Sequence, residues 1–225
     1  MSKTKCLLNC YNQDLNNYEI GSDEVGRGCL FGAVYASAVI LPKNSDTFNY
    51  SLMKDSKKFT SSKKLKEVAE YIKENAIAYS VAFESEKIVD QYNILQASQM
   101  AMHKSINELV QKYKDEPNSI RLLIDGNYFK PFYTMNNKTN KLEEIENITI
   151  EQGDNKYCAI AAASILAKDA RDQYIKDLCV KYPYLEERYK LTSNKGYAAK
   201  VHREGIMEYG ITEWHRKTFG ICKNY

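Results

Sequence analysis

Near the amino terminus, two adjacent carboxylates precede an arginine that stands between two glycines. Asp23 and Glu24 offer the oxygen ligands that a hard divalent cation binds. The run Gly26-Arg27-Gly28 suits an anion that approaches the backbone closely, because glycine has no Cβ and the guanidinium binds anions well. One short segment therefore combines groups for a metal ion and for a phosphate, which is the chemistry of phosphodiesters.

Two further aspartates stand at the ends of expected elements. Asp125 follows an apolar run and precedes a glycine, so it lies at the carboxyl end of a buried strand, where open α/β sheets place ligands. A plain Asp-Gly turn is the alternative. Asp154 precedes a long helix, where it could also be an ordinary N-cap. Together with Asp23 and Glu24 they would repel one another unless cations lay between them. The sequence therefore predicts a two-metal site for Mg²⁺ or Mn²⁺.

Several other polar side chains are weaker candidates. Lys57 and Lys58 precede a helix in a Ser/Lys-rich run, which suits phosphate contacts or a solvated basic face. Ser164 and Lys168 lie one helical turn apart and either reach the site or face solvent. Asp172 has the spacing of an exposed ion-pair partner for Lys168.

Composition narrows the class of protein. A net charge of +3 allows a basic patch but excludes a protein that coats DNA by bulk charge. His202 and His215 have no ligand spacing, so we expect structural or substrate-side roles. Neither zinc spacing nor a CxxC pair occurs among the cysteines, and scattered thiols indicate a reducing, cytoplasmic setting without a signal peptide or membrane span. The six cysteines are Cys6, Cys10, Cys29, Cys158, Cys179 and Cys222.

The elements that would position these groups alternate along the chain. Hydrophobic patterns predict the strands 19–23, 32–41, 76–83, 121–125 and 148–152, the helices 61–75, 96–113 and 155–180, and short helices and loops over 185–216. This order predicts an α/β fold with a mixed central sheet flanked by helices and a C-terminal helical extension. We expect residues 1–180 to form the catalytic part and residues 181–225 the extension packed on it, acting as one domain.

The placement of Glu24 needs a local explanation. Neighbouring side chains of a regular strand point to opposite faces, so Asp23 and Glu24 would not reach one site. We therefore expect the first strand to end at Asp23, with the glycines beyond it turning Glu24 inward.

At this point the chain resembles a known family, ribonuclease HII, the type 2 ribonucleases H. The resemblance covers the chain from about residue 19 to residue 219, and its motifs occur in the family's order. They are DEVGRG (23–28), DSKKF (55–59), LLIDGN (122–127), GDNKYCAIAAASILAKDARD (153–172), NKGYAAKVHREGI (194–206) and ITEWHRKTF (211–219).

The resemblance implies a ribonuclease-H-like fold and an endonuclease that hydrolyses the RNA strand of RNA–DNA hybrids. It also implies cutting at ribonucleotides embedded in duplex DNA, by two-metal-ion catalysis that leaves 5′-phosphate and 3′-hydroxyl ends. We expect a monomer. The tail 221–225 contains no docking motif, so no sliding-clamp interaction is indicated.

Roles for individual residues follow from the same resemblance. The family's four metal-binding acids match Asp23, Glu24, Asp125 and Asp154, its reader of the ribonucleotide 2′-hydroxyl matches Gly26, Arg27 and Gly28, and its tyrosine that senses the RNA-to-DNA junction matches Tyr197. The 2′-hydroxyl is the group that distinguishes RNA from DNA whatever the base. For Tyr197 the alternative is a core-edge aromatic on a short helix, and for Arg27 an ion pair with a nearby acid.

Some positions depart from the family's usual pattern without removing an acid. They are Val25, Cys29, Phe31, Phe59, Asp169 and the pair Ala198-Ala199. The last of these stands beside Tyr197 and puts the junction preference in doubt.

Three other functions compete. The sister family, ribonuclease HIII, usually has Gly-Thr-Gly in the loop, a glutamate as fourth ligand and an extra N-terminal domain, whereas this chain has Arg27, Asp154 and about twenty residues before the first strand. A non-catalytic nucleic-acid binder should lack an acid, because an uncompensated acidic cluster repels phosphate. A small-molecule phosphotransferase would need a nucleotide-binding glycine loop, which we do not find.

Overall fold

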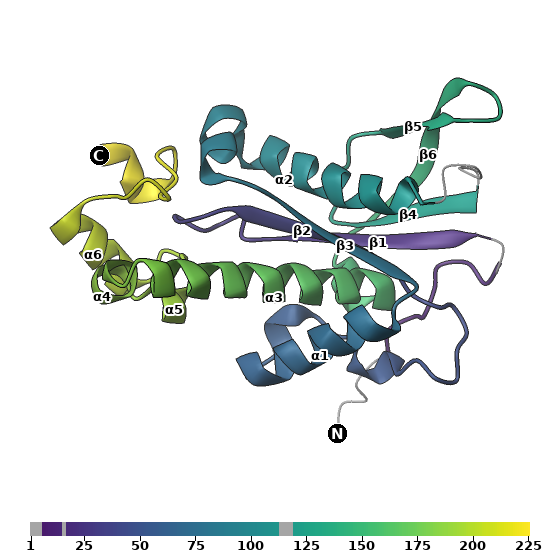
Figure 1. Ribbon diagram of the computed structural model, residues 1–225, viewed down its shortest axis with the longest axis horizontal. Coiled ribbons are helices and arrows are strands. Elements are labelled where there is room, and N and C mark those ends of the chain that lie inside the picture. Colours follow the sequence, from purple (N-terminus) through teal and green to yellow (C-terminus); the bar gives the residue numbers. More distant parts are fainter. Residues whose placement is uncertain (1–5, 15–16, 113–118) are drawn as a thin grey trace.

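The computed structural model describes residues 6–14, 17–112 and 119–225. Its centre is a six-stranded sheet in the order β3-β2-β1-β4-β6-β5 (Figure 1). The strands β1 and β4 are parallel, as are β4 and β6, and the other neighbours are antiparallel, so the predicted mixed sheet is confirmed. The strands are β1 Tyr18–Val25, β2 Val34–Ile40, β3 Ala78–Glu84, β4 Ile120–Asp125, β5 Phe132–Asn136 and β6 Lys141–Ile150.

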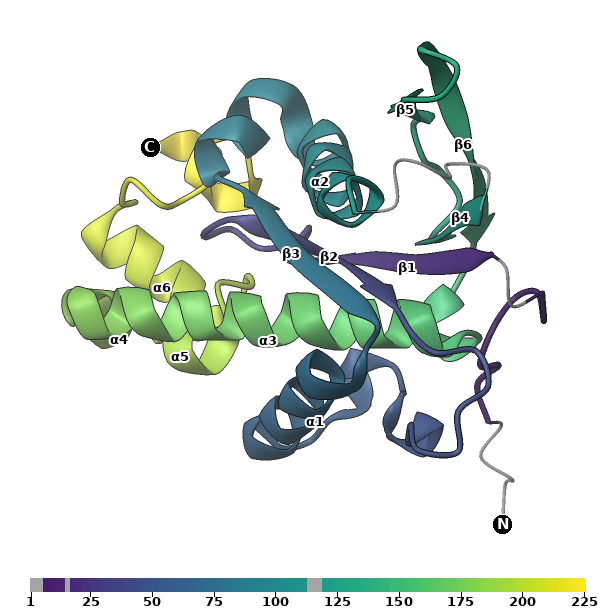
Figure 2. The same cartoon turned by 45° about the vertical axis from the view of Figure 1, so that its right-hand side comes forward.

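Helices cover both faces of this sheet. One face is covered by α2, while α3 and α1 lie on the other, as the turned view shows (Figure 2). The helices are α1 Ser62–Asn75, α2 Glu86–Val110, α3 Cys158–Lys181, α4 Tyr184–Tyr189, α5 Leu191–Asn194 and α6 Lys200–Tyr209. Short 3₁₀ helices are η1 Tyr50–Leu52, η2 Ser56–Lys58, η4 Gly153–Asn155 and η5 Gly220–Asn224. In the described part of the chain, no helix combines the length and the apolar character needed to cross a membrane.

The long helix α3 packs unusually close to β1. A Cβ added at Gly21 would lie only 2.3 Å from the carbonyl carbon of Ala159, so only glycine fits there. Alanines on α3, including Ala161 and Ala162, are completely buried against the sheet. This close packing brings the middle of α3, with Ser164, next to the end of β1.

The structure corrects several element boundaries. The first strand runs on through Glu24 to Val25, so the expected turn at Asp23 is wrong. Helix α2 begins at Glu86 and bends at Asn93, where φ is 69° and ψ is 165°, and the last residue of the predicted helix, Tyr113, lies outside the described residues. Strand β6 is longer than predicted, and the prediction missed β5, its hairpin partner.

The C-terminal helices share a hydrophobic core with the end of α3. Ile175 and Cys179 of α3 pack with Leu185, Ile206 and Cys222 of the following segments, and all five side chains are buried. The extension is therefore packed against the α/β body at one end of the sheet (Figure 1).

Candidate active site

Three of the four acids line one cavity at the end of the central strands. Asp23 of β1, Glu24 and Asp125 of β4 lie around a space of about 230 Å³. The two strands are parallel with Ser22 opposite Ile124, so Asp23 and Asp125 occupy the next step of the register. Because β4 ends at Asp125, the end of β1 projects past this neighbour, and both Asp23 and Glu24 reach the cavity without the turn that we expected.

Asp154 stands behind this group. It is buried in η4, directly after Gly153, whose amide donates to Oδ1 of Asp125 at 2.7 Å. That bond ties the end of β4 to η4. The N-cap alternative is wrong, because α3 begins later, at Cys158, with Tyr157 in the N-cap position. Asp154 does not line the cavity itself, but its charge acts on Asp23.

Burial and neighbouring charges raise the pKa of three of the acids, Asp23, Asp125 and Asp154. Burial raises the pKa of Asp23 well above its usual range, the charges of Glu24 and Asp125 add to this, and a hydrogen bond from Ser164 opposes it. Burial also raises the pKa of Asp125 and of Asp154. For Asp125, the hydrogen bond from the amide of Gly153 opposes this rise. The site therefore concentrates negative charge that a cation would relieve.

The donor set fits a hard divalent cation. The cavity is lined by carboxylates and by the hydroxyls of Ser56 and Ser164, with no histidine or cysteine, and such oxygen donors suit Mg²⁺ or Mn²⁺. Within the described residues, no group of three or more His, Cys, Asp or Glu side chains forms a ready-made ion site. The carboxylates surround the cavity without closing a cage, and Oε1 of Glu24 accepts from Arg27 at 3.0 Å.

The glycine-rich loop and Tyr197 also line this cavity. Gly26, Arg27 and Gly28 line the cavity together with Tyr197, which is 45% exposed in the turn between α5 and α6. The short-helix alternative for Tyr197 is therefore wrong. A Cβ added at Gly28 would lie 3.9 Å from Cε1 of the tyrosine ring. The ion-pair alternative for Arg27 is confirmed, and its side chain remains half exposed.

The three candidate lysines differ in whether they reach the cavity. Lys57 and Lys168 line the cavity, whereas Lys58 turns to the side-chain oxygen of Asn155. Lys168 also pairs with Asp172 at 3.6 Å, as its spacing predicts, but Asp172 is buried rather than exposed. Of its two alternatives, Lys168 therefore follows the one that reaches the site, and it also contacts its helix partner.

Ser164 reaches the cavity from α3. Its hydroxyl lies 3.0 Å from that of Ser56, which the sequence interpretation missed although it stands in the DSKKF segment. Asp55 in the same segment accepts from the amide of Lys57 at 2.8 Å and so begins η2. The sequence contained a signal for η2 and hence for Ser56, because an aspartate before a short polar run is a common helix cap.

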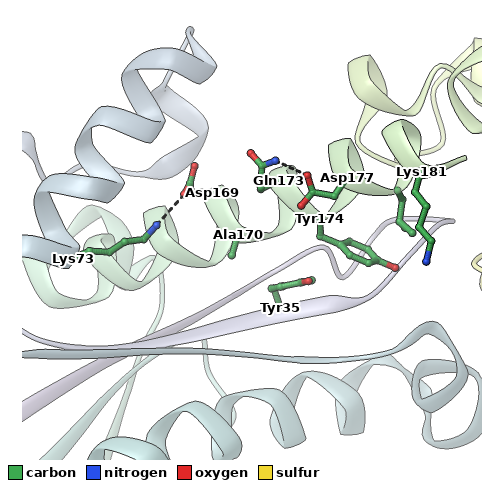
Figure 3. A pocket seen from close by; sticks show the side chains of 9 residues that line it. Tyr35, Lys73, Asp169, Ala170, Gln173, Tyr174, Asp177 and Lys181 are labelled. Atoms are coloured by element: carbon green, nitrogen blue, oxygen red, sulfur yellow. Dashed lines mark hydrogen bonds and ion pairs between the residues drawn. The ribbon is translucent and has the colours of Figure 1, made fainter. Parts of the chain in front are cut away.

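A second cavity, of about 450 Å³, lies along α3 and contains none of the four acids (Figure 3). There Asp169 points toward Lys73 of α1, with 3.5 Å between carboxylate and ammonium. Gln173 donates to Asp177 at 2.7 Å on the same helix. The departure at Asp169 is thus explained by an ion pair between α3 and α1.

His202 and His215 are structural. Both rings are almost fully buried, and their Nε2 atoms lie 3.1 Å apart, away from the acids. The structural alternative for both is therefore the correct one.

Known proteins resemble this chain in sequence and in fold. The sequence model of the family described as Ribonuclease HII matches residues 20–222. The Ribonuclease HII of Parabacteroides distasonis is 45% identical over 203 residues, covering 90% of each chain. That of Bacteroides thetaiotaomicron is 43% identical over 215 residues, covering 96% of this chain and 94% of its own.

Solved structures share the fold. The PCNA:RNase HII complex from Archaeoglobus fulgidus contains a chain with a TM-score of 0.64 at 22% identity, covering 91% of this chain and 96% of that one. Bst-RNase HIII in complex with Mn²⁺ gives 0.56 at 20% identity, covering 88% and 64%. The ribonuclease-H-like fold is therefore confirmed. By the family match and the relatives above, this chain belongs to the ribonuclease HII family and is a ribonuclease H hydrolase.

Proposed function

We propose that this chain hydrolyses the RNA strand of RNA–DNA hybrids and also cuts at single ribonucleotides embedded in duplex DNA, leaving 5′-phosphate and 3′-hydroxyl ends. One observation carries the proposal: Asp23, Glu24 and Asp125 line the same cavity as the loop 26–28 and Tyr197. Carboxylates suited to metal ions thus lie directly beside a backbone that can approach a sugar.

Metal ions complete the chemistry. Asp23, Glu24, Asp125 and Asp154 would hold Mg²⁺ or Mn²⁺, and two bound ions would activate a water and stabilise the leaving oxygen. The Mn²⁺ in the structure of Bst-RNase HIII supports this assignment by analogy of fold. Arg27 would move from Glu24 to the substrate phosphate, which frees the carboxylate for a metal.

The loop 26–28 and Tyr197 would recognise the sugar. Gly28 brings its backbone to the cavity without a side chain, so its amide can bond to a 2′-hydroxyl at close range. The ring of Tyr197 would pack on the adjacent deoxyribose, where a further hydroxyl would crowd it. Lys57 and Lys168 would contact phosphates, while Lys58 would contribute less because Asn155 holds its ammonium.

We further infer that residues 1–180 form the catalytic part and that residues 181–225 complete it as an extension, in a monomer. The archaeal relative in the solved complex binds PCNA. For this chain we retain the prediction of no clamp contact through the tail, since Cys222 in η5 is completely buried. Mixing the chain with a bacterial sliding clamp on a size-exclusion column would test both the monomer and the absence of a complex.

The decisive assay uses a DNA duplex with one ribonucleotide, incubated with Mg²⁺ or Mn²⁺. We expect a single cut beside the ribonucleotide. Asp23→Asn should reduce cutting far more than the roughly 10–100-fold that loss of an outer partner of a metal ligand causes, yet retain binding. Asp169→Asn, on the same helix as Ser164 but at the other cavity, is the matched control and should cut normally.

Two results would contradict the proposal. If the duplex and a long RNA–DNA hybrid both stay intact with either metal, the catalytic assignment is wrong. Binding of both substrates without cleavage would instead favour the non-catalytic nucleic-acid binder. Efficient cutting by Asp23→Asn would remove Asp23 from the metal site.

A further inference from the structure

Arg216, near the end of the chain, forms hydrogen bonds with the backbone of the segment between β1 and β2, which includes the glycine-rich loop 26–28. Its side chain is completely buried. The Nε atom donates to the carbonyl of Gly32 at 2.9 Å, and Nη1 donates to the carbonyl of Arg27 at 3.0 Å. One guanidinium therefore joins Arg27 and Gly32, near the two ends of this segment, although Arg216 is 189 residues from Arg27 in the chain.

The backbone around Arg216 reinforces this contact. The amide of Arg216 donates to Leu30 at 2.8 Å, and the amide of Gly32 donates to Trp214 at 2.8 Å. These bonds make an antiparallel bridge between Phe31 and His215. The segment 214–216 thus pairs with the segment 30–32, and this pairing fixes where the guanidinium lies.

The bond to Arg27 has a directional consequence. The described peptide bonds are trans, and across a trans peptide the carbonyl and the next amide point in opposite directions. Since the carbonyl of Arg27 points inward to Arg216, the amide of Gly28 points outward. Gly28 lines the cavity, and its amide makes no hydrogen bond within the described part of the chain. The Gly28 amide is therefore a free hydrogen-bond donor in the cavity that the acids line.

The charge of Arg216 argues against a purely structural role. Among the described residues, no carboxylate lies within 4.0 Å of its guanidinium, and Nη2 has no hydrogen-bond partner. Burial lowers the pKa of Arg216 to about 10, and nearby Arg171 adds to this, so it stays charged at neutral pH. A buried guanidinium without a direct ion-pair partner is costly compared with an apolar side chain.

We propose that Arg216 is a positioning residue for sugar recognition, which holds the Arg27–Gly28 peptide so that the Gly28 amide donates to the 2′-oxygen of the ribonucleotide. This inference rests on the proposed function. Arg171, the other buried arginine, binds the carbonyls of Ala33, Lys195 and Phe31 and leaves the Arg27 peptide to Arg216.

The experiment measures binding without cleavage, in the Asp23→Asn background. Three labelled duplexes differ only at one sugar, which is ribose, deoxyribose or 2′-fluoro-deoxyribose. The fluorine keeps a ribose-like pucker but accepts hydrogen bonds poorly. We expect Arg216→Lys to lower the preference for ribose over deoxyribose by about 5- to 10-fold, the range of one hydrogen bond. Affinity for the all-DNA duplex should stay the same.

The 2′-fluoro duplex separates positioning from general loosening. If Arg216 acts through the Gly28 amide, the substitution and the fluorine remove the same interaction, so Arg216→Lys should hardly change 2′-fluoro binding. Ile206→Ala is the control: Ile206 is completely buried in the C-terminal hydrophobic cluster, and its apolar side chain forms no hydrogen bond with the carbonyl of Arg27. It should lower the Tm and leave the sugar preference intact.

The outcomes are distinct. A folded Arg216→Lys with the parental preference overturns the inference, and so does an equal loss in Ile206→Ala. If Arg216→Lys does not fold, Asp90→Ala decides, because Asp90 accepts from the amides of Lys217 at 2.8 Å and Thr218 at 2.9 Å. It should lower the preference in the same direction, and an unchanged preference overturns the inference. A parent that binds ribose and deoxyribose duplexes equally would instead contradict the proposed function.

Discussion

His215 and His202 share a hydrogen bond between their Nε2 atoms, at 3.1 Å, in the interior of the C-terminal extension. His215 Nδ1 accepts from the amide of Thr212 at 2.9 Å, and His202 Nδ1 lies 2.8 Å from the carbonyl of Tyr197. These partners assign the tautomers: His215 donates from Nε2, and His202 accepts there and donates from Nδ1. The chain of bonds ends on the tyrosine that lines the active-site cavity.

This pair should make the fold sensitive to acid. Burial, with His202 beside it, lowers the pKa of His215 to about 3, and burial also lowers the pKa of His202. The unfolded state takes up the proton first, so this stability is complete above the unfolded pKa of about 6.5 and falls as the pH drops below it. Each pH unit should cost about 1.4 kcal/mol for His215 alone.

Urea unfolding at pH 7.5 and pH 5 would measure this loss. The raised pKa values of Asp23 and Asp125 act in the opposite direction, so the comparison needs a variant. His215→Gln keeps one donor and one acceptor but does not titrate. It should be less sensitive to acid than the parent by about 2 kcal/mol at pH 5. Equal acid sensitivity in both proteins would contradict the assignment.

Gly26 should resist substitution for two reasons. Its φ is +94°, and an added Cβ would lie 2.2 Å from Nε of Arg171. We expect Gly26→Ala to cost about 2–4 kcal/mol in urea unfolding, since backbone strain adds to displacement of a buried arginine. Gly126 has a φ of +99° with no atom within 4 Å of the added Cβ. Gly126→Ala should therefore cost only about 1–2 kcal/mol, and equal costs would exclude the arginine as the cause.

Tyr197 should set the preference between substrates. Its ring lies beside Gly28 and lines the cavity, so Tyr197→Ala should lower cutting at a single embedded ribonucleotide relative to a long hybrid. If packing on the sugar contributes as much as the stacking of an aromatic ring on a base, about 1–3 kcal/mol, the loss corresponds to about 5- to 140-fold. Tyr133 is 50% exposed on β5 and does not line the cavity, so Tyr133→Ala is the control. Unchanged selectivity in Tyr197→Ala would leave Tyr197 a packing role.

Lys57 and Lys58 are adjacent but should behave differently. Lys57 lines the cavity, whereas the ammonium of Lys58 is bound to Asn155. If Lys57 contacts a phosphate, Lys57→Ala should reduce the slope of log affinity against log salt by about 1. Lys58→Ala should change the slope much less. Salt titrations of duplex binding would test this, and equal slopes in the two variants would place both lysines in a general basic face.

Local sequence patterns were enough to predict most of the sheet and the long helices. The alternation in 32–41 and the apolar run before Asp125 identify β2 and β4, because these patterns depend only on which side chains face the core. The hairpin β5–β6 was largely missed. Of the residues of β6 only Ile145 and Ile150 are buried, and three are glutamates, so the alternation that marks a strand is weak.

The four acids could be named from residue types and motif order, but their arrangement could not. Glu24 reaches the cavity because β4 ends one residue short of it, and Asp154 lies in η4 rather than at the N-cap of α3. Both facts depend on where a neighbouring element stops. Periodicity within one segment carries no information about that.

The sequence by itself therefore determined the chemistry, because it supplies carboxylates that can bind a cation and glycines that let a substrate approach the backbone closely. Only packing in three dimensions decided what supports that chemistry. Arg216 and Arg27 meet across 189 residues, and no local pattern marks a buried arginine as the partner of a loop carbonyl. The physical reason is that hydrogen bonds of this kind form only after the hydrophobic core has brought distant segments together and excluded water.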